Sequence, residues 1–196
     1  MTKTFFLRLS VSLLGAFFSL GQAKAAIHRP VLKQAPPKPQ DDASLINSND
    51  CKKITAFLEK KHDIPKDLLG AIARVESGKS PWAVNARGRS HQFRNKERAL
   101  KFIQDLKKKG DKNINVGYMQ INLQSHECKF KKLEDVLTPY HNIAYAAKLL
   151  KHLHKRYGSW EAAIRYYHSG SSAHNLPYQR KVFQAWGTAC SKSYAG

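Results

Sequence analysis

A helical stripe that ends on a carboxyl group constrains the fold of this chain more than any other sequence feature. Leu68, Ile72 and Glu76 follow one another at intervals of four residues, which places them on one face of a helix. Gly78 then stands where a glycine commonly closes a helix. The apolar face and the negative end of the helix dipole both disfavour an ionised carboxyl group, so the pattern predicts a raised pKa for Glu76. Such a group suits general acid catalysis, whereas a solvated glutamate at a frayed helix end is the alternative that remains open.

The N-terminus has the pattern of a secretory signal peptide. Lys3 and Arg8 precede an apolar run over residues 9–20, and the small residues Ala23 and Ala25 form a cleavage site. We assign residues 1–25 to the signal peptide, with the cut after Ala25, and the alternative is an uncleaved membrane anchor. Export to the periplasm is the expectation, and no later stretch is apolar enough to span a membrane.

The strongly basic charge favours an anionic polymer as partner. The formal net charge is +20, and removal of a signal segment with three basic residues and no acids leaves +17. Long-range attraction of this kind often indicates nucleic acid, but the predicted export argues against it. The cell wall and the membrane surface are the anionic polymers outside the cytoplasm, although much of the charge also fits a solvated face.

Composition divides the rest of the chain into a linker, one domain and a short tail. Residues 26–49 are rich in proline and predict an extended linker, residues 50–187 are expected to form one folded domain, and residues 188–196 are a C-terminal tail. An exported domain can keep a disulfide, but three cysteines, Cys51, Cys128 and Cys190, allow three pairings with one thiol left over.

Apolar periodicity predicts a mainly helical domain with a small β-like insertion. A helix capped by Asn49 or Asp50 leads to the one that carries Glu76, with Pro65 in its first turn. A hairpin is expected around residues 86–89 and a β-like stretch over 115–123. Further helices are expected over about 95–109, 142–157, 160–168 and 177–186.

Four short motifs occur in one order along the chain. They are Glu76-Ser77, Gly117-Tyr118-Met119-Gln120-Ile121-Asn122, Asn142-Ile143-x-Tyr145-Ala146-Ala147 and Tyr166-Tyr167-His168-Ser169-Gly170. Together they resemble the SLT domain of lytic transglycosylases, which has a goose-type-lysozyme-like fold. The likeness covers roughly residues 51–186 and is greatest to small exported members associated with secretion and conjugation systems.

The resemblance implies one catalytic residue and no cofactor or metal. Glu76 would protonate the glycosidic oxygen between N-acetylmuramic acid and N-acetylglucosamine of peptidoglycan, then accept the proton of the muramoyl C6 hydroxyl as a 1,6-anhydro ring closes. Ordinary glycosidases use two carboxylates at a defined spacing. The candidates for a second one lie in no recognisable motif: Asp105, Asp111, Glu127, Glu134 and Asp135.

The resemblance also implies a sugar groove lined by the other motif residues. The expected substrate-binding residues are Ser77, Gly117, Tyr118, Met119, Gln120, Asn122, Tyr167, His168 and Tyr178. Within this set Tyr167 matches the family tyrosine that hydrogen-bonds near the glutamate, with Tyr166 as the alternative. His168 replaces the asparagine of many members and offers either a similar or a titrating hydrogen bond. Asn142 is expected to brace its helix rather than to act in catalysis.

Two other functions fit the same sequence. A hydrolytic muramidase could use the same fold, and a catalytically inactive wall-binding protein could serve the assembly of an envelope-spanning machine. The insertion over residues 95–109 could shape the groove, meet a partner, or be a surface decoration. Nucleic-acid binding has no motif to support it.

Overall fold

The computed structural model describes residues 39–168 and 172–193, and the predicted signal peptide lies outside this part of the chain. In chain order the elements are α1 (Pro39–Ile46), α2 (Cys51–Lys61), α3 (Leu68–Ser77), β1 (Ala83–Ala86), β2 (Arg89–Gln92), α4 (Lys96–Lys108), β3 (Ile114–Val116), β4 (Ile121–Asn122), α5 (Leu123–His126), a 3-10 turn (Glu127–Lys129), α6 (Leu133–Val136), α7 (Pro139–Tyr157), α8 (Trp160–His168) and α9 (Ser172–Ser193). The predicted mainly helical class with a small β element is therefore confirmed.

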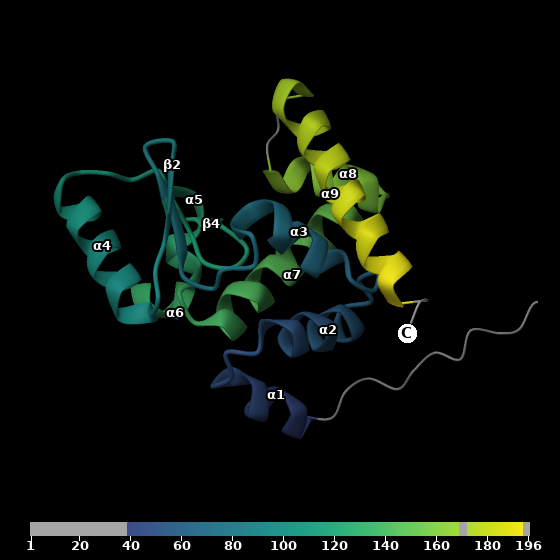
Figure 1. The fold of residues 1–196 in the computed structure, drawn as a ribbon, viewed down its shortest axis with the longest axis horizontal. Coiled ribbons are helices and arrows are strands. Elements are labelled where there is room, and N and C mark those ends of the chain that lie inside the picture. The colour runs from purple at the N-terminus through teal and green to yellow at the C-terminus, as the bar shows by residue number, and fades with distance from the viewer. Residues whose placement is uncertain (1–38, 169–171, 194–196) are drawn as a thin grey trace, which may run out of the picture. The chain divides into compact units, whose positions relative to one another are not determined.

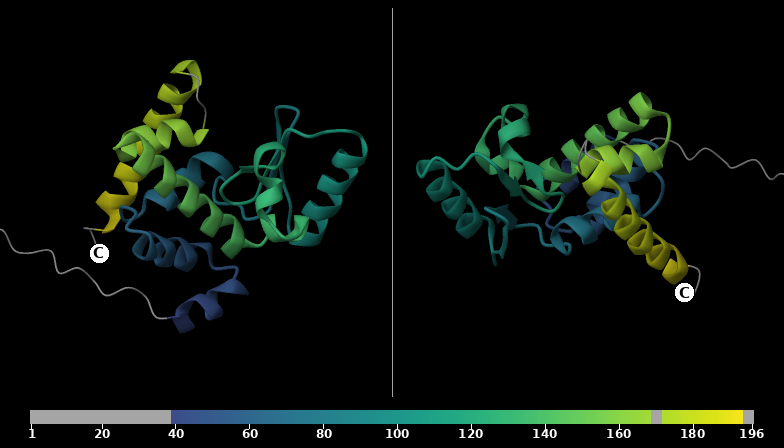
Figure 2. Two further views of the ribbon diagram at one scale, coloured as in Figure 1. Left: turned by 180° about the vertical axis from the view of Figure 1, so that it is seen from behind. Right: turned by 90° about the horizontal axis from the view of Figure 1, so that it is seen from above.

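Helices α3 and α7 lie at the centre of the domain. Helix α3 packs against α9 and α2, and α7 packs against α8 and α2. Figures 1 and 2 show the sheet and α4 on one side of this central pair and α8 with α9 on the other. The most deeply buried side chains come from both groups of elements, so one hydrophobic core joins them; examples are Leu68, Ile72, Ile103, Met119 and Ile143.

The four strands form an antiparallel sheet in the order β2-β1-β3-β4. The predicted hairpin joins β1 to β2 through Arg87 and Gly88, whose φ values of 53° and 72° suit a tight turn that matches the twist of a sheet. The predicted β-like stretch forms β3, a turn over residues 117–120, and β4. Because β1 pairs with β3, this turn lies next to the end of α3 that carries Glu76.

The predicted insertion is helix α4, and it is part of the core rather than a surface decoration. Asn95 caps it by accepting a hydrogen bond from the Arg98 amide at 3.0 Å. Its apolar face, with Ala99 and Ile103 fully buried and Leu106 nearly so, belongs to the same hydrophobic cluster as the sheet. Contacts with β1 therefore attach the insertion to the strand that lies beside the turn.

Three helices begin at positions that differ from prediction. The expected linker over residues 26–49 contains helix α1, because a proline at a first helical position loses no hydrogen bond and Leu45 packs against the core. Helix α3 begins at Leu68, after a turn in which the Pro65 carbonyl accepts from the Leu68 amide at 3.2 Å. Helix α7 begins at Pro139, three residues before the predicted start.

The last helix is longer than predicted at both ends. We expected it over about 177–186 with a tail from residue 188, whereas α9 runs from Ser172 to Ser193 with Pro177 inside it. A proline is a good first residue of a helix, which is why Pro177 suggested a start. In the second turn of α9 it removes one backbone hydrogen bond, and packing against α3 and α8 supports the helix there.

Candidate active site

Helix α3 is fixed at both ends and carries Glu76 in its last turn. At its start the Glu59 carboxylate accepts from the Asp67 amide at 2.9 Å and from the Leu69 amide at 2.8 Å. At its end Gly78, with φ of 63°, donates its N–H to the carbonyls of Ala73 and Arg74. The predicted glycine cap is thus confirmed, and Glu76 projects from a helix whose termini are both satisfied.

Burial gives Glu76 the raised pKa that its position predicts. The side chain is half-buried, and loss of hydration raises the pKa of its carboxyl group to about 7. The Tyr178 hydroxyl donates to Oε1 of Glu76 at 2.7 Å, which stabilises the ionised form and opposes the effect of burial. Glu76 can therefore exchange its proton near neutral pH, as a group that acts first as acid and then as base requires.

The turn between β3 and β4 is held by Asn142 of α7. The buried Asn142 side chain donates from Nδ2 to the carbonyls of Val116 at 3.0 Å and Val136 at 2.8 Å, and its Oδ1 accepts from the Met119 amide at 2.8 Å. All the hydrogen-bonding groups of this side chain face backbone, so the structural role expected for Asn142 fits its contacts.

Gly117 is required by this contact with Asn142. Its φ is 83°, and a Cβ at this position would lie 2.4 Å from Nδ2 of Asn142. Gly117 was expected to line the sugar groove, and the atoms nearest to its missing Cβ belong to the Asn142 side chain. The turn is also tied to the sheet, because the Gly117 amide donates to the Ala83 carbonyl at 2.8 Å.

The side chains of Ser77, Tyr118 and Met119 are buried where the end of α3 meets the turn. The buried Ser77 hydroxyl donates to the Tyr118 carbonyl at 2.7 Å and lies 3.1 Å from the Ala73 carbonyl, which ties the end of α3 to the turn. Met119 is fully buried and Tyr118 nearly so. These three side chains and Gly117 are outside the described lining of the cavity beside Glu76, so they support that cavity from below.

A cavity of about 440 Å³ opens beside Glu76, and half of the predicted site residues line it. Glu76, Gln120, Asn122, Tyr167 and His168 line it. The side-chain Nε2 of Gln120 donates to the Gly117 carbonyl at 2.9 Å, and Gln120 has a φ of 48°, so the turn fixes the direction of this side chain. The Tyr167 hydroxyl donates to the Met119 carbonyl at 2.8 Å, which packs α8 against the turn.

The hydrogen bond to Glu76 comes from Tyr178 rather than from the motif tyrosine. Tyr178 lies on α9, outside the described cavity lining, and its ring stacks on His168 with centroids 4.3 Å apart and an interplanar angle of 7°. Burial raises the pKa of the Tyr167 hydroxyl, and the nearby carboxylate of Glu76 raises it further. Tyr166 stacks on Tyr157 with centroids 3.9 Å apart and is exposed.

Further polar side chains in the cavity wall were not predicted from the sequence. They are Asn85, Asn113, Asn115, Ser125 and His126. Asn122 organises them, donating to Oδ1 of Asn113 at 2.6 Å and of Asn115 at 2.9 Å while its own Oδ1 caps α5 at the Ser125 amide. The alternation Asn113-Ile114-Asn115 could have predicted part of this group, because polar residues on either side of a buried strand residue lie on one face of the sheet. Amides of this kind suit the hydroxyl and N-acetyl groups of a sugar chain.

Glu76 is the only carboxylate among the described residues that line the cavity. Asp111 is held by Arg87 in a bidentate pair at 2.9 and 2.8 Å, Glu127 pairs with Lys107, and Asp105 lies 4.0 Å from Lys108.

Within residues 39–168 and 172–193 no group of three His, Cys, Asp or Glu side chains is placed to hold a metal ion. Cys51 is buried, Cys128 is exposed, and both are free thiols.

The fold and this site define a lysozyme-like domain with a single acidic group beside an amide-lined cavity. Residues 54–184 match the family described as the Transglycosylase SLT domain, and the chain belongs to this family. Members of the family are lytic transglycosylases, which assigns peptidoglycan as the class of substrate.

Two curated proteins are similar in sequence to this chain. Protein IpgF of Shigella sonnei and Protein IpgF of Shigella flexneri are each 31% identical over 131 residues, which covers 65% of this chain and 74% of each relative. No solved structure matches the chain at a significant level. Within the described ranges no helix is both long and apolar enough to cross a membrane.

Proposed function

We propose that the chain cleaves the β-1,4 bond between N-acetylmuramic acid and N-acetylglucosamine of peptidoglycan and forms 1,6-anhydro-N-acetylmuramic acid. This proposal rests on the environment of Glu76. Burial raises its pKa to about 7, and the described cavity lining contains no second carboxylate. Hydrolysis by the usual pair of carboxylates would need a second carboxylate at a defined distance from Glu76. A single residue that acts as acid and then base suits an internal nucleophile supplied by the substrate.

The proton balance of this reaction closes on Glu76 alone. The protonated carboxyl group donates to the glycosidic oxygen as the bond from that oxygen to C1 breaks, which frees the 4-hydroxyl of N-acetylglucosamine. The muramoyl C6 oxygen bonds to C1, and its proton returns to the Glu76 carboxylate. Tyr178 donates to Oε1 of Glu76 and thereby stabilises the carboxylate that exists between the two transfers.

Digestion of purified sacculi tests the reaction. We expect products with 1,6-anhydromuramoyl ends, identified by mass spectrometry, and reducing muramoyl ends would show a hydrolytic muramidase instead. Glu76→Gln should abolish product release while binding to sacculi is retained, and Glu97→Gln, at an exposed position in the first turn of α4, is the matched control. Binding by the parent chain without any product would identify a wall-binding assembly protein.

We also propose that the chain is exported to the periplasm and opens the wall locally for a secretion or conjugation apparatus. The basic residues Lys3 and Arg8, the apolar run after them and the small residues before Ala26 support export. N-terminal sequencing of the protein recovered from the periplasmic fraction should begin at Ala26. Retention of Met1 in a membrane fraction would show an uncleaved anchor.

A further inference from the structure

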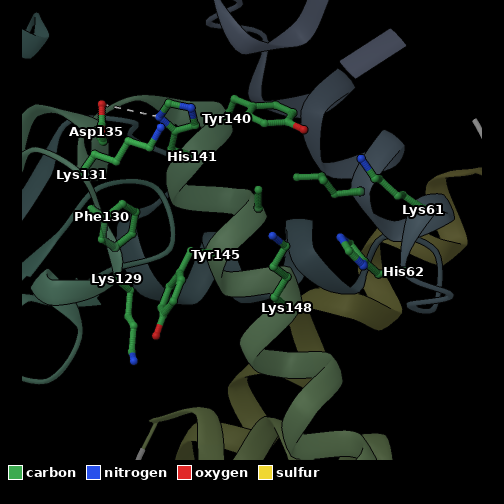
Figure 3. A pocket seen from close by; sticks show the side chains of 12 residues that line it. Lys61, His62, Lys129, Phe130, Lys131, Asp135, Tyr140, His141, Tyr145 and Lys148 are labelled. Carbon is green, nitrogen blue, oxygen red and sulfur yellow. Dashed lines mark ion pairs between the residues drawn. The ribbon is translucent and has the colours of Figure 1, made fainter. Parts of the chain in front are cut away.

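A second cavity, of about 450 Å³, lies between α2, α7 and the segment that follows α5. Figure 3 shows Lys61 and His62 on one side of α7, Lys129, Phe130 and Lys131 on the other, and Tyr145 with Lys148 on the helix between them. We name this cavity the basic pocket. Its wall combines cationic side chains with the aromatic rings of Phe130 and Tyr145, whose centroids lie 5.2 Å apart.

Three lysines of the basic pocket have no acidic partner among the residues that the structure describes. Lys129, Lys131 and Lys148 are exposed, and none of their side-chain ammonium groups has a hydrogen bond or ion pair with a residue in the described part of the chain. Asp135 is the only acidic residue in the pocket lining that the structure describes. It already accepts from the Lys132 amide at 3.2 Å and lies 3.8 Å from Nδ1 of His141. A ligand with more than one negative charge is therefore favoured here.

The basic pocket shares a wall with the cavity beside Glu76. His126 lines that cavity, and its Nδ1 lies 2.8 Å from the hydroxyl of Tyr145, which lines the basic pocket. On α7 the consecutive residues Lys148 and Leu149 line the basic pocket and the cavity respectively. The two cavities therefore lie side by side across this contact, as a branched polymer that fills both would require.

We propose that the basic pocket binds the carboxylates of the peptide stems that branch from the glycan strand. This inference rests on the proposed function, since the strand must occupy the cavity beside Glu76. The stems of peptidoglycan carry several carboxylates next to short aliphatic side chains. The lysines match the carboxylates, and the rings of Phe130 and Tyr145 offer apolar surface to the methyl and methylene groups.

Direct binding tests this assignment without any need for catalysis. The probe is the free stem peptide L-Ala–D-Glu–diaminopimelate–D-Ala, titrated against the chain carrying Glu76→Gln. We expect binding to weaken at least tenfold in the triple variant Lys129→Glu, Lys131→Glu and Lys148→Glu. A matched triple variant of equal charge, Lys101→Glu, Lys109→Glu and Lys155→Glu, changes exposed residues outside both cavities and should bind as the parent does.

Three outcomes of the titration would overturn the proposal. They are no binding of the stem peptide to the parent chain, equal weakening in both triple variants, and binding of a hexaglutamate peptide in place of the stem peptide. The last outcome would indicate a docking site for an acidic protein segment. Thermal unfolding of each variant shows that the fold is intact.

An activity assay separates failure of this proposal from failure of the proposed function. Two substrates are digested: glycan strands with intact stems, and strands from which an amidase has removed the stems. The enzymes are the parent chain and the basic-pocket triple variant, both with Glu76 intact. We expect the basic-pocket variant to raise KM several-fold on the intact strands only, with kcat unchanged. Equal KM values on both kinds of strand would overturn the pocket assignment, whereas no cleavage of either strand by the parent would overturn the proposed reaction and leave the titration as the test of the pocket.

Discussion

At the level of single residues, the chemistry depends on how the hydroxyl of Tyr178 and the burial of Glu76 oppose each other. Burial raises the pKa of the Glu76 carboxyl group, while the hydrogen bond of 2.7 Å to Oε1 holds that rise in check. The stacked ring of His168 positions Tyr178 for this contact, with 4.3 Å between the ring centroids. The pKa of about 7 is thus the result of burial, opposed by the Tyr178 hydroxyl, rather than of the helix alone.

Removal of the Tyr178 hydroxyl should raise the pKa of Glu76 further. The hydroxyl stabilises the ionised carboxylate, so Tyr178→Phe favours the protonated form and shifts the alkaline limb of the pH–activity profile to higher pH. We expect kcat to fall by about tenfold, because a hydrogen bond to a charged group is lost. The measurement is the pH dependence of kcat/KM on purified glycan strands.

Tyr166→Phe is the control for this change. Tyr166 stacks on Tyr157, and its hydroxyl has no hydrogen bond to another described residue, so the pH profile of this variant should match that of the parent. An unshifted profile in Tyr178→Phe, or a shifted one in Tyr166→Phe, would contradict the role assigned to Tyr178.

At the level of elements, the turn between β3 and β4 is positioned by α7 rather than by its own sequence. Asn142 satisfies three backbone groups, one of them the Met119 amide inside the turn, and Tyr167 of α8 donates to the Met119 carbonyl. Gln120, which lines the cavity, belongs to the same turn. A shift of α7 or α8 would therefore move the cavity wall that faces Glu76.

Gly117→Ala should destabilise the domain and displace this turn. The added Cβ would meet Nδ2 of Asn142 at 2.4 Å at a residue whose φ is 83°, so we expect the free energy of unfolding to fall by about 2–4 kcal/mol. Denaturant unfolding measures the change. Gly70→Ala is the control, because a Cβ there meets nothing within 4 Å and alanine favours the helix. Equal stability of Gly117→Ala and the parent would contradict the packing of Asn142 against the turn.

At the level of the whole molecule, two glutamates make stability depend on pH near neutrality. Burial raises the pKa of both Glu59 and Glu76 to about 7 from an ordinary value of 4.5. The folded chain then holds these protons more tightly than the unfolded chain does. Their contribution to stability is complete below about pH 4.5 and is lost as the pH rises through about 7.

Thermal melts between pH 5 and pH 8 should show this decline directly. We expect the Tm of the parent to fall over this range, and Glu59→Gln and Glu76→Gln each to reduce the fall because neither amide titrates. Glu97→Gln, at an exposed position, should leave the pH dependence as it is in the parent. A Tm that rises from pH 5 to pH 8 in the parent, with the same slope in all variants, would contradict the raised pKa values.

Local patterns in the sequence were sufficient for the helix that carries Glu76 and for the hairpin. The spacing of Leu68, Ile72 and Glu76, the cap at Gly78 and the turn at Arg87-Gly88 depend on neighbours within four residues. Four motifs in order were sufficient for the family. Such features are readable because helix periodicity and turn geometry act over short distances along the chain.

The tertiary structure decided which side chains meet. Tyr178 reaches Glu76 across 102 residues, and Asn142 rather than a ligand is the close neighbour of Gly117. The asparagines of the cavity and the lysines of the basic pocket come from segments that meet only when the helices and the sheet have packed. Local periodicity therefore determined that Glu76 ends an apolar stripe, and packing of α9 and α8 on α3 and the turn decided its partner, its burial and hence its pKa.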